Sequence, residues 1–239
     1  MKAMIFAAGL GTRFKPWTNS HPKALAIVNG KSLLQRNIEY LQQYGIRDVV
    51  VNVHHFAEQI LSAIHHSKSW GSTIVVSDES AVVLETGGGL LKAKDLLGNE
   101  PFITLNVDIL TNLNLHQFIK QHQQTEASIT LAVAQRDTSR FLLFDAANRL
   151  CGWRNINDGG LVEKIAVSAE QYEQKAYSGL AVFEPTVFQS VPFTGKFSLI
   201  DVFLHLAPTH LIAGYDHSGD RWVDVGRPES VPVAESLFS

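Results

Sequence analysis

The stretch Ala7–Leu25 reads AAGLGTRFKPWTNSHPKAL and follows the apolar run KAMIF. It holds two glycines, two prolines and three cations within one loop. A buried parallel strand is typically a continuous apolar run, and glycines at its end let backbone N–H groups approach an anion closely. Arg13 can bind two phosphate oxygens with its planar guanidinium, and Lys23 adds a point charge. We therefore interpret this stretch as a phosphate-binding loop after the first strand.

Two common phosphate-binding motifs do not fit the loop. In the dinucleotide pattern G-x-G-x-x-G the third glycine is replaced here by Phe14, and Pro16 and Pro22 interrupt the helix that should follow. No Gly-Lys-Ser/Thr follows at the spacing of a nucleoside triphosphatase loop. A nicotinamide-dependent oxidoreductase is therefore disfavoured, and a different phosphate site remains.

Length and composition limit the class of protein. The chain has 239 residues, of which 45% are hydrophobic, and a net charge of −3. This predicts one domain over 1–239. The charge argues against nucleic acid or an anionic membrane as partner.

Cysteine use and apolar runs suggest where the protein works. Cys151 is the only cysteine, so neither an internal disulfide nor a cysteine zinc cluster is possible. The first apolar run is too short for a signal peptide, and no run approaches the ~20 residues of a membrane helix. We expect a cytoplasmic protein.

Strand and helix patterns alternate through the first half. Strands are predicted over 2–7, 47–55, 72–79 and 101–108, and helices over 31–45, 56–66, 87–98 and 114–124. Further strands over 127–135, 140–146, 149–155 and 175–185 precede helices over 197–207 and 227–238. This order predicts an α/β fold, a three-layer, doubly wound arrangement around a mixed, mostly parallel sheet.

The carboxyl ends of parallel strands meet at one edge of a sheet, where ligands bind. The Gly9 loop, Asn52, Asp78 and Asp108 all fall at or near predicted strand ends. This placement predicts a site at that edge, from the pattern alone.

The loop resembles a family signature. The pattern G-x-G-T-R-x-x-P-x-T, followed by P-K, is similar to that of nucleotidyltransferases that join a sugar 1-phosphate to a nucleoside triphosphate. The matching residues are Gly9, Gly11, Thr12, Arg13, Pro16, Thr18, Pro22 and Lys23. The resemblance spans nearly the whole chain and is densest over 1–108.

The resemblance implies roles for the loop and for two aspartates. Arg13 and Lys23 would be catalytic, Arg13 on the β- and γ-phosphates and Lys23 on the α-phosphate or the sugar phosphate. Asp108 and Asp224 would hold Mg²⁺. The nucleotide-binding set would comprise Ala8, Gly9, Gly11, Thr12, Arg13, Lys23, Gly87 and Gly88. For Gly87 and Gly88, tight packing of a glycine-rich helix is the alternative interpretation.

The resemblance also implies that the single domain divides into a nucleotide-binding half (1–126) and a sugar-binding half (127–239), with a site for the sugar. Its residues would be Glu85, Asn106, Arg140 and Gly179. Arg140 stands where close relatives carry a different residue, so the sugar's identity is open. The segment LVEKIAV offers Lys164 for the sugar phosphate, although an exposed charged pair on a strand explains Glu163 and Lys164 equally well.

Substrate identity rests on the segment ETGGG, residues 85–89. It is similar to a subgroup that uses UTP and N-acetylmuramate 1-phosphate in bacterial cell-wall recycling. Mannose, glucose or heptose 1-phosphate, choline phosphate, and GTP or CTP stay open as alternatives. So does a non-catalytic regulatory subunit that binds sugar nucleotides. The oligomeric state cannot be deduced from the sequence.

Overall fold

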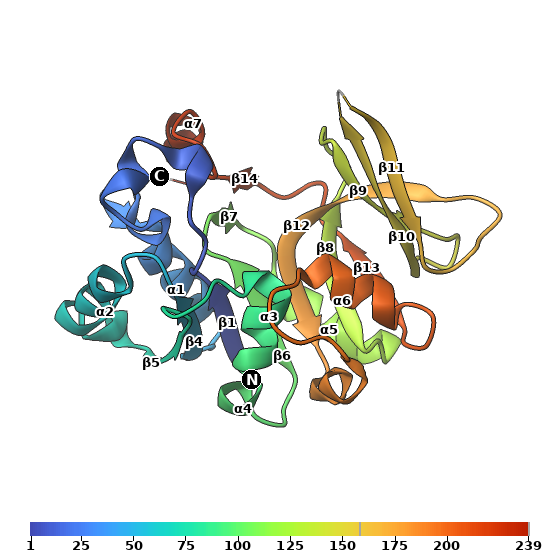
Figure 1. Ribbon diagram of the computed structural model, residues 1–239, viewed down its shortest axis with the longest axis horizontal. Coiled ribbons are helices and arrows are strands. Elements are labelled where there is room, and N and C mark those ends of the chain that lie inside the picture. Colours follow the sequence, from blue (N-terminus) through green and yellow to red (C-terminus); the bar gives the residue numbers. More distant parts are fainter. Residues whose placement is uncertain (158, 239) are drawn as a thin grey trace.

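The computed structural model describes residues 1–157 and 159–238, which form one mixed ten-stranded sheet with smaller two-stranded sheets beside it (Figure 1). Four strands of the first half run parallel in the order β6, β1, β4, β5. Their bounds are β1 (Lys2–Phe6), β4 (Asp48–Val53), β5 (Thr73–Asp78) and β6 (Phe102–Asn106). Their carboxyl ends share one edge, as the sequence predicts.

The second half continues the same sheet through β12 (Glu173–Phe183), which runs antiparallel to β6. β12 also pairs with β8 (Ile129–Ala134) and β9 (Arg140–Phe144). Antiparallel β10 (Leu150–Asn157) and β11 (Gly160–Ile165) extend it beyond β9, and β13 (Ile212–Asp216) lies parallel to β8. The strands predicted from the sequence do not include β13.

Helices cover both faces of the sheet, which makes three layers. One face packs against α1 (Leu33–Gln43), α2 (Ala57–His66), α5 (Leu115–Thr125) and α7 (Ser230–Leu237). The other packs against α3 (Glu85–Lys92), α4 (Lys94–Leu97) and α6 (Leu199–Leu206). Neighbouring β1 side chains divide accordingly, Ile5 to the first face and Met4 to the second. The α/β fold class is confirmed.

The predicted helix over 87–98 differs in the structure. Its glycines lie inside α3 rather than at its start, and the helical path breaks at Ala93 before α4. No helix among residues 1–157 and 159–238 is long and apolar enough to cross a membrane.

Short elements complete the edge where the strands end. β7 (Ile109–Thr111) pairs antiparallel with β14 (Trp222–Asp224), and β2 (Ile27–Val28) pairs with β3 (Lys31–Ser32). The opening loop contains three short 3₁₀ turns, η1 (Thr12–Phe14), η2 (Trp17–Asn19) and η3 (Lys23–Leu25). Two further turns are η4 (Lys68–Gly71) and η5 (Pro185–Ser190).

Candidate active site

A buried asparagine holds the start of the opening loop. Asn52 Oδ1 accepts the backbone N–H groups of Ala7 at 2.7 Å and Ala8 at 3.3 Å. Asn52 Nδ2 in turn donates to Glu79 Oε1 at 2.7 Å. Because burial dominates, the pKa of the Glu79 carboxyl is raised above its usual value. The N–H groups of Ala7 and Ala8 are therefore already paired, and the phosphate-facing part of the loop begins at Gly9.

The turn at Gly11 depends on glycine. Its φ is +60°, and a Cβ there would lie 2.8 Å from Thr18 Cγ2. The Thr18 hydroxyl donates to the Gly11 carbonyl at 2.9 Å. Gly9, in contrast, faces open space. Gly11 and Thr18 thus shape the loop, while Gly9 leaves room beside it.

Strand pairing brings Asp108 and Asp224 together. Asp108 precedes β7 and Asp224 ends β14, and the Val225 N–H donates to the Asp108 carbonyl at 2.8 Å. Burial raises the pKa of the Asp224 carboxyl, and the negative charge of Asp108 raises it further. Asp224 Oδ1 is buried and has no hydrogen-bond partner among the described residues.

The two predicted catalytic cations lie against these carboxylates. The Lys23 ammonium contacts the Asp108 carboxylate, and both side chains are only 14% exposed. Arg13 Nη2 lies 4.0 Å from Asp224 Oδ2. Gly226 permits this approach, because a Cβ there would lie 2.6 Å from Asp224 Oδ1 and 2.8 Å from Arg13 Nη2. The structure therefore assembles all four residues at one point.

The carboxylate pair suits a divalent cation that is shared with a substrate. The unpartnered Asp224 oxygen and the mutual repulsion with Asp108 both favour a bound cation. No cluster of three or more histidine, cysteine, aspartate or glutamate side chains that could hold a metal occurs within 1–157 and 159–238. Two protein carboxylates are typical of Mg²⁺, which keeps waters and binds substrate phosphates.

Two cavities flank this point. The loop cavity, of about 430 Å³, is lined by Phe6, Ala8, Gly9, Leu10, Gly11, Thr12, Asn52, Val83, Glu85, Thr86 and Lys196. The arginine cavity, of about 610 Å³, is lined by Arg13, Arg136, Thr138, Ser139, Arg140, Phe141, Leu142, Trp153, Tyr177, Ile200, Asp224 and Arg227. Since Thr12 lines one and Arg13 the other, the opening loop borders both cavities.

The glycines of α3 do not face the loop cavity. A Cβ on Gly87 would lie 2.5 Å from the Phe197 ring, and one on Gly88 would lie 2.2 Å from the Gly195 carbonyl. Both backbone N–H groups donate to the Phe197 carbonyl. The missing side chains of Gly87 and Gly88 therefore make room for the segment 195–198, which favours the packing interpretation of these glycines, and their role in binding the nucleotide stays a prediction.

The predicted sugar residues separate into three places. Glu85 lines the loop cavity, where its Oε1 lies 3.4 Å from Lys196 Nζ. Arg140 lines the arginine cavity. Asn106 adjoins Gly179, where φ is +82° and a Cβ would lie 3.1 Å from Asn106 Nδ2. Gly179 stands at an irregularity in the pairing of β12 with β8.

Lys164 is engaged elsewhere. It lies on β11, 3.5 Å from Asp201, and lines a different cavity beside α6. Its neighbour Glu163 pairs with Arg154 at 2.5 Å. The charged-pair interpretation therefore describes this segment better than a contact with a sugar phosphate.

Sequence reasoning missed several residues of the two cavities. Arg136 and Lys196 carry no local motif, and only sheet pairing and loop packing bring them to the cavities. Glu79 follows β5 directly, and its position after a strand that ends at the ligand edge was a signal that could have identified it.

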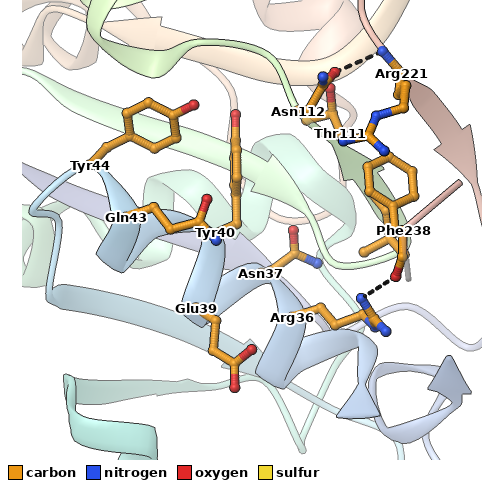
Figure 2. A pocket seen from close by; sticks show the side chains of 11 residues that line it. Arg36, Asn37, Glu39, Tyr40, Gln43, Tyr44, Thr111, Asn112, Arg221 and Phe238 are labelled. Carbon is orange, nitrogen blue, oxygen red and sulfur yellow. Dashed lines mark hydrogen bonds between the residues drawn. The ribbon is translucent and has the colours of Figure 1, made fainter. Parts of the chain in front are cut away.

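A further cavity, of about 250 Å³, lies beside α1 and shares no residue with the two cavities above (Figure 2). We call it the α1 cavity. It too has two arginines, but both are already bonded. Arg36 Nη1 donates to the Phe238 carbonyl at 3.0 Å, and Arg221 Nη1 donates to the Leu237 carbonyl at 2.7 Å. The C-terminal segment thus accepts hydrogen bonds from both arginines of this cavity.

Comparison with known proteins agrees with this geometry. A family model described as "Nucleotidyl transferase" matches residues 2–237. The chain is 31% identical to the N-acetylmuramate alpha-1-phosphate uridylyltransferase of Caulobacter vibrioides, covering 99% of this chain and 96% of that protein. It is 30% identical to the enzyme of the same name from Neisseria meningitidis serogroup B, covering 99% and 98%.

Solved structures share the fold. The crystal structure of HddC from Yersinia pseudotuberculosis complexed with GMP-PN has a TM-score of 0.78 at 24% identity, covering 100% of this chain and 99% of that one. A UDP-glucose pyrophosphorylase complexed with UDP-glucose has a TM-score of 0.76 at 18% identity, covering 99% and 97%. With a family model that matches almost every residue, the chain belongs to the nucleotidyl transferase family and is a nucleotidyltransferase.

Proposed function

We propose that this protein transfers UMP from UTP to N-acetylmuramate 1-phosphate, giving the UDP-sugar and pyrophosphate. One observation carries the proposal: Arg13 and Lys23 converge on the Asp108–Asp224 pair where two substrate-sized cavities border one loop. The loop cavity would take the nucleotide and the arginine cavity the sugar. The two similar uridylyltransferases support the choice of substrates.

The proposed reaction needs no covalent enzyme intermediate. An oxygen of the sugar phosphate attacks the α-phosphorus of UTP in line, that P–O bond forms, and the bond to pyrophosphate breaks. Catalysis then consists of positioning the two substrates and neutralising charge. Arg13 would bind the β- and γ-phosphates and stabilise the departing pyrophosphate, because its guanidinium stands more than half exposed beside the site.

Lys23 would change partners when substrates bind. It contacts Asp108 in the structure, and it would turn to the α-phosphate or the sugar phosphate. Asp108 and Asp224 would hold Mg²⁺, which when bound supplies charge neutralisation at the phosphate oxygens. The Val225–Asp108 backbone bond would keep these two carboxylates at a fixed separation.

The test is pyrophosphate release by the purified protein with Mg²⁺. UTP, GTP, CTP and ATP would be crossed with the 1-phosphates of N-acetylmuramate, N-acetylglucosamine, mannose, glucose and heptose. We expect the highest kcat/KM with UTP and N-acetylmuramate 1-phosphate, and loss of release on adding a chelator. A higher kcat/KM with another pair overturns the proposed substrates. Nucleotide binding without release from any pair favours the regulatory-subunit alternative.

A further inference from the structure

The arginine cavity carries more positive charge than its single carboxylate balances. Four arginines line it, and Asp224 is the only acidic residue among the described residues that do so. Of the four, only Arg13 lies within ion-pair distance of a described carboxylate, that of Asp224. A substrate that enters this cavity therefore meets three guanidinium groups that have no carboxylate partner among the described residues.

The four arginines come from two ends of the cavity. Arg13 and Arg227 lie at the end that contains Asp224, because Arg13 of the opening loop approaches its carboxylate and Arg227 follows it by three residues. Arg136 and Arg140 come from the connection between β8 and β9 and from the first position of β9. Those strands lie on the side of the sheet away from α1 and α2 (Figure 1). The phosphate of a sugar 1-phosphate belongs at the Asp224 end.

Two contacts hold the Arg136 side chain in place, and one of its N–H groups has no acceptor among the described residues. Its guanidinium lies 3.9 Å from the centroid of the Trp222 ring, and its Nη2 donates to the Tyr177 carbonyl at 2.8 Å. The Nε–H group is buried and meets no acceptor among the described residues. A buried donor without a partner is costly, so this arrangement favours a ligand that brings an acceptor.

Arg140 stands exposed on the strand that forms one wall of the cavity. Arg140 lies opposite Asn155, and two residues further along the strands Leu142 of β9 lies opposite Trp153 of β10; both Leu142 and Trp153 line the cavity. The wall thus combines an apolar surface, which suits the ring of a sugar, with a guanidinium at its end. Arg140 has no ion-pair partner among the described residues.

We infer that Arg136 and Arg140 select a sugar 1-phosphate that carries a carboxylate in addition to its phosphate. This inference rests on the proposed function and names the group that distinguishes its substrate. The carboxylate accepts hydrogen bonds from a planar guanidinium in a two-point geometry, and it supplies the negative charge that this end of the cavity lacks. A neutral sugar leaves these donors unpaired, and a site built in this way discriminates against the analogue without the group.

The test compares substrates that differ by one acidic group. N-acetylmuramate 1-phosphate differs from N-acetylglucosamine 1-phosphate by a lactyl ether with a carboxylate, and glucuronate 1-phosphate differs from glucose 1-phosphate at one carbon. We expect wild-type kcat/KM to favour N-acetylmuramate 1-phosphate over its neutral counterpart. In Arg140→Gln this preference should fall by about 10- to 100-fold, the range for one charge-assisted pair. Arg136→Lys should reduce it in the same direction while keeping the charge.

A matched variant controls for the loss of charge. Arg149 lies just before β10, exposed and paired with Asp145 outside the cavity, so Arg149→Gln should leave the preference unchanged. Equal loss for acidic and neutral substrates in Arg140→Gln overturns the inference, as does a wild-type preference for the neutral member. A stronger preference for glucose 1,6-bisphosphate than for glucuronate 1-phosphate overturns the choice of a carboxylate.

If the proposed function itself is wrong, the assay gives a different result. In that case no sugar 1-phosphate yields pyrophosphate with any nucleotide. Calorimetry of the same acidic and neutral sugar phosphates with wild-type protein and Arg140→Gln then decides the inference by itself. Tighter binding of the acidic member that is lost in Arg140→Gln supports it, and equal affinities overturn it.

Discussion

Two cavities of this protein contain arginines, and they differ in what those arginines already bind. In the α1 cavity, Arg36 donates to the Phe238 carbonyl (Figure 2), and Arg221 donates to the Leu237 carbonyl. In the arginine cavity, Arg136 keeps a buried Nε–H without a partner. The number of arginines in a cavity does not identify a ligand site, because a guanidinium can instead bind backbone carbonyls and stabilise the fold. Hydrogen-bonding capacity that the chain leaves unsatisfied is the better criterion.

The largest expected effect separates catalysis from folding at the Asp108–Asp224 pair. Asp108→Asn removes one anionic oxygen for Mg²⁺ and should lower kcat by about 10³-fold. The amide oxygen still accepts from Lys23, so the fold should persist. Pyrophosphate release and thermal unfolding measure the two consequences. Full activity in this variant would disprove the metal role of Asp108.

We expect the glycines of α3 to affect the stability of the fold. Gly88→Ala would place a Cβ 2.2 Å from the Gly195 carbonyl, so the segment 195–198 must move. We expect a loss of roughly 1–3 kcal/mol in the free energy of unfolding, as for other overpacked positions. Denaturant unfolding measures it. Gly219→Ala is the matched control, since that position faces open space. Equal stability of the two variants would contradict the packing role.

Arg36→Ala tests whether the arginines of the α1 cavity serve the fold alone. It removes the hydrogen bonds to the Phe238 and Val28 carbonyls, which should cost about 1–2 kcal/mol of unfolding free energy. Arg36 lies outside both proposed substrate cavities, so kcat/KM and the preference for acidic sugars should stay at wild-type values. A changed substrate preference would show that the α1 cavity also influences substrate binding.

The smallest expected effect concerns the stability of the ligand-free protein. The pKa of Asp224 is higher in the folded protein than in the unfolded chain, mainly because of burial and then because of Asp108. The folded state thus binds more protons between the two pKa values, and unfolding free energy falls as pH rises through that interval. Asp224→Asn should therefore raise the Tm slightly at pH 7 without Mg²⁺, while activity is lost. A lower Tm would show that Arg13 and Lys23 stabilise the ionised carboxylate more than burial and repulsion destabilise it.

The opening loop could be predicted because its geometry is local. Gly11 adopts a positive φ beside Thr18, and both residues lie within the quoted stretch. The roles of Gly87 and Gly88 could not be predicted in the same way. Their partners lie about a hundred residues later in the chain, and a glycine-rich segment is equally compatible with binding a nucleoside and with close packing.

The sequence by itself determined the parallel half of the sheet, the edge where its strands end, and the loop that begins at Gly9. Strand runs, helix periodicity and glycine placement act over a few residues, so the pattern contains them. The resemblance already implied that Asp108 and Asp224 act together, but the tertiary structure shows how they meet, through the pairing of β7 with β14, and it alone places Arg136 on the Trp222 ring beside a wall formed by β9 and β10. Such contacts join residues far apart in the chain, and burial and satisfied hydrogen bonds select them only when the whole sheet has formed.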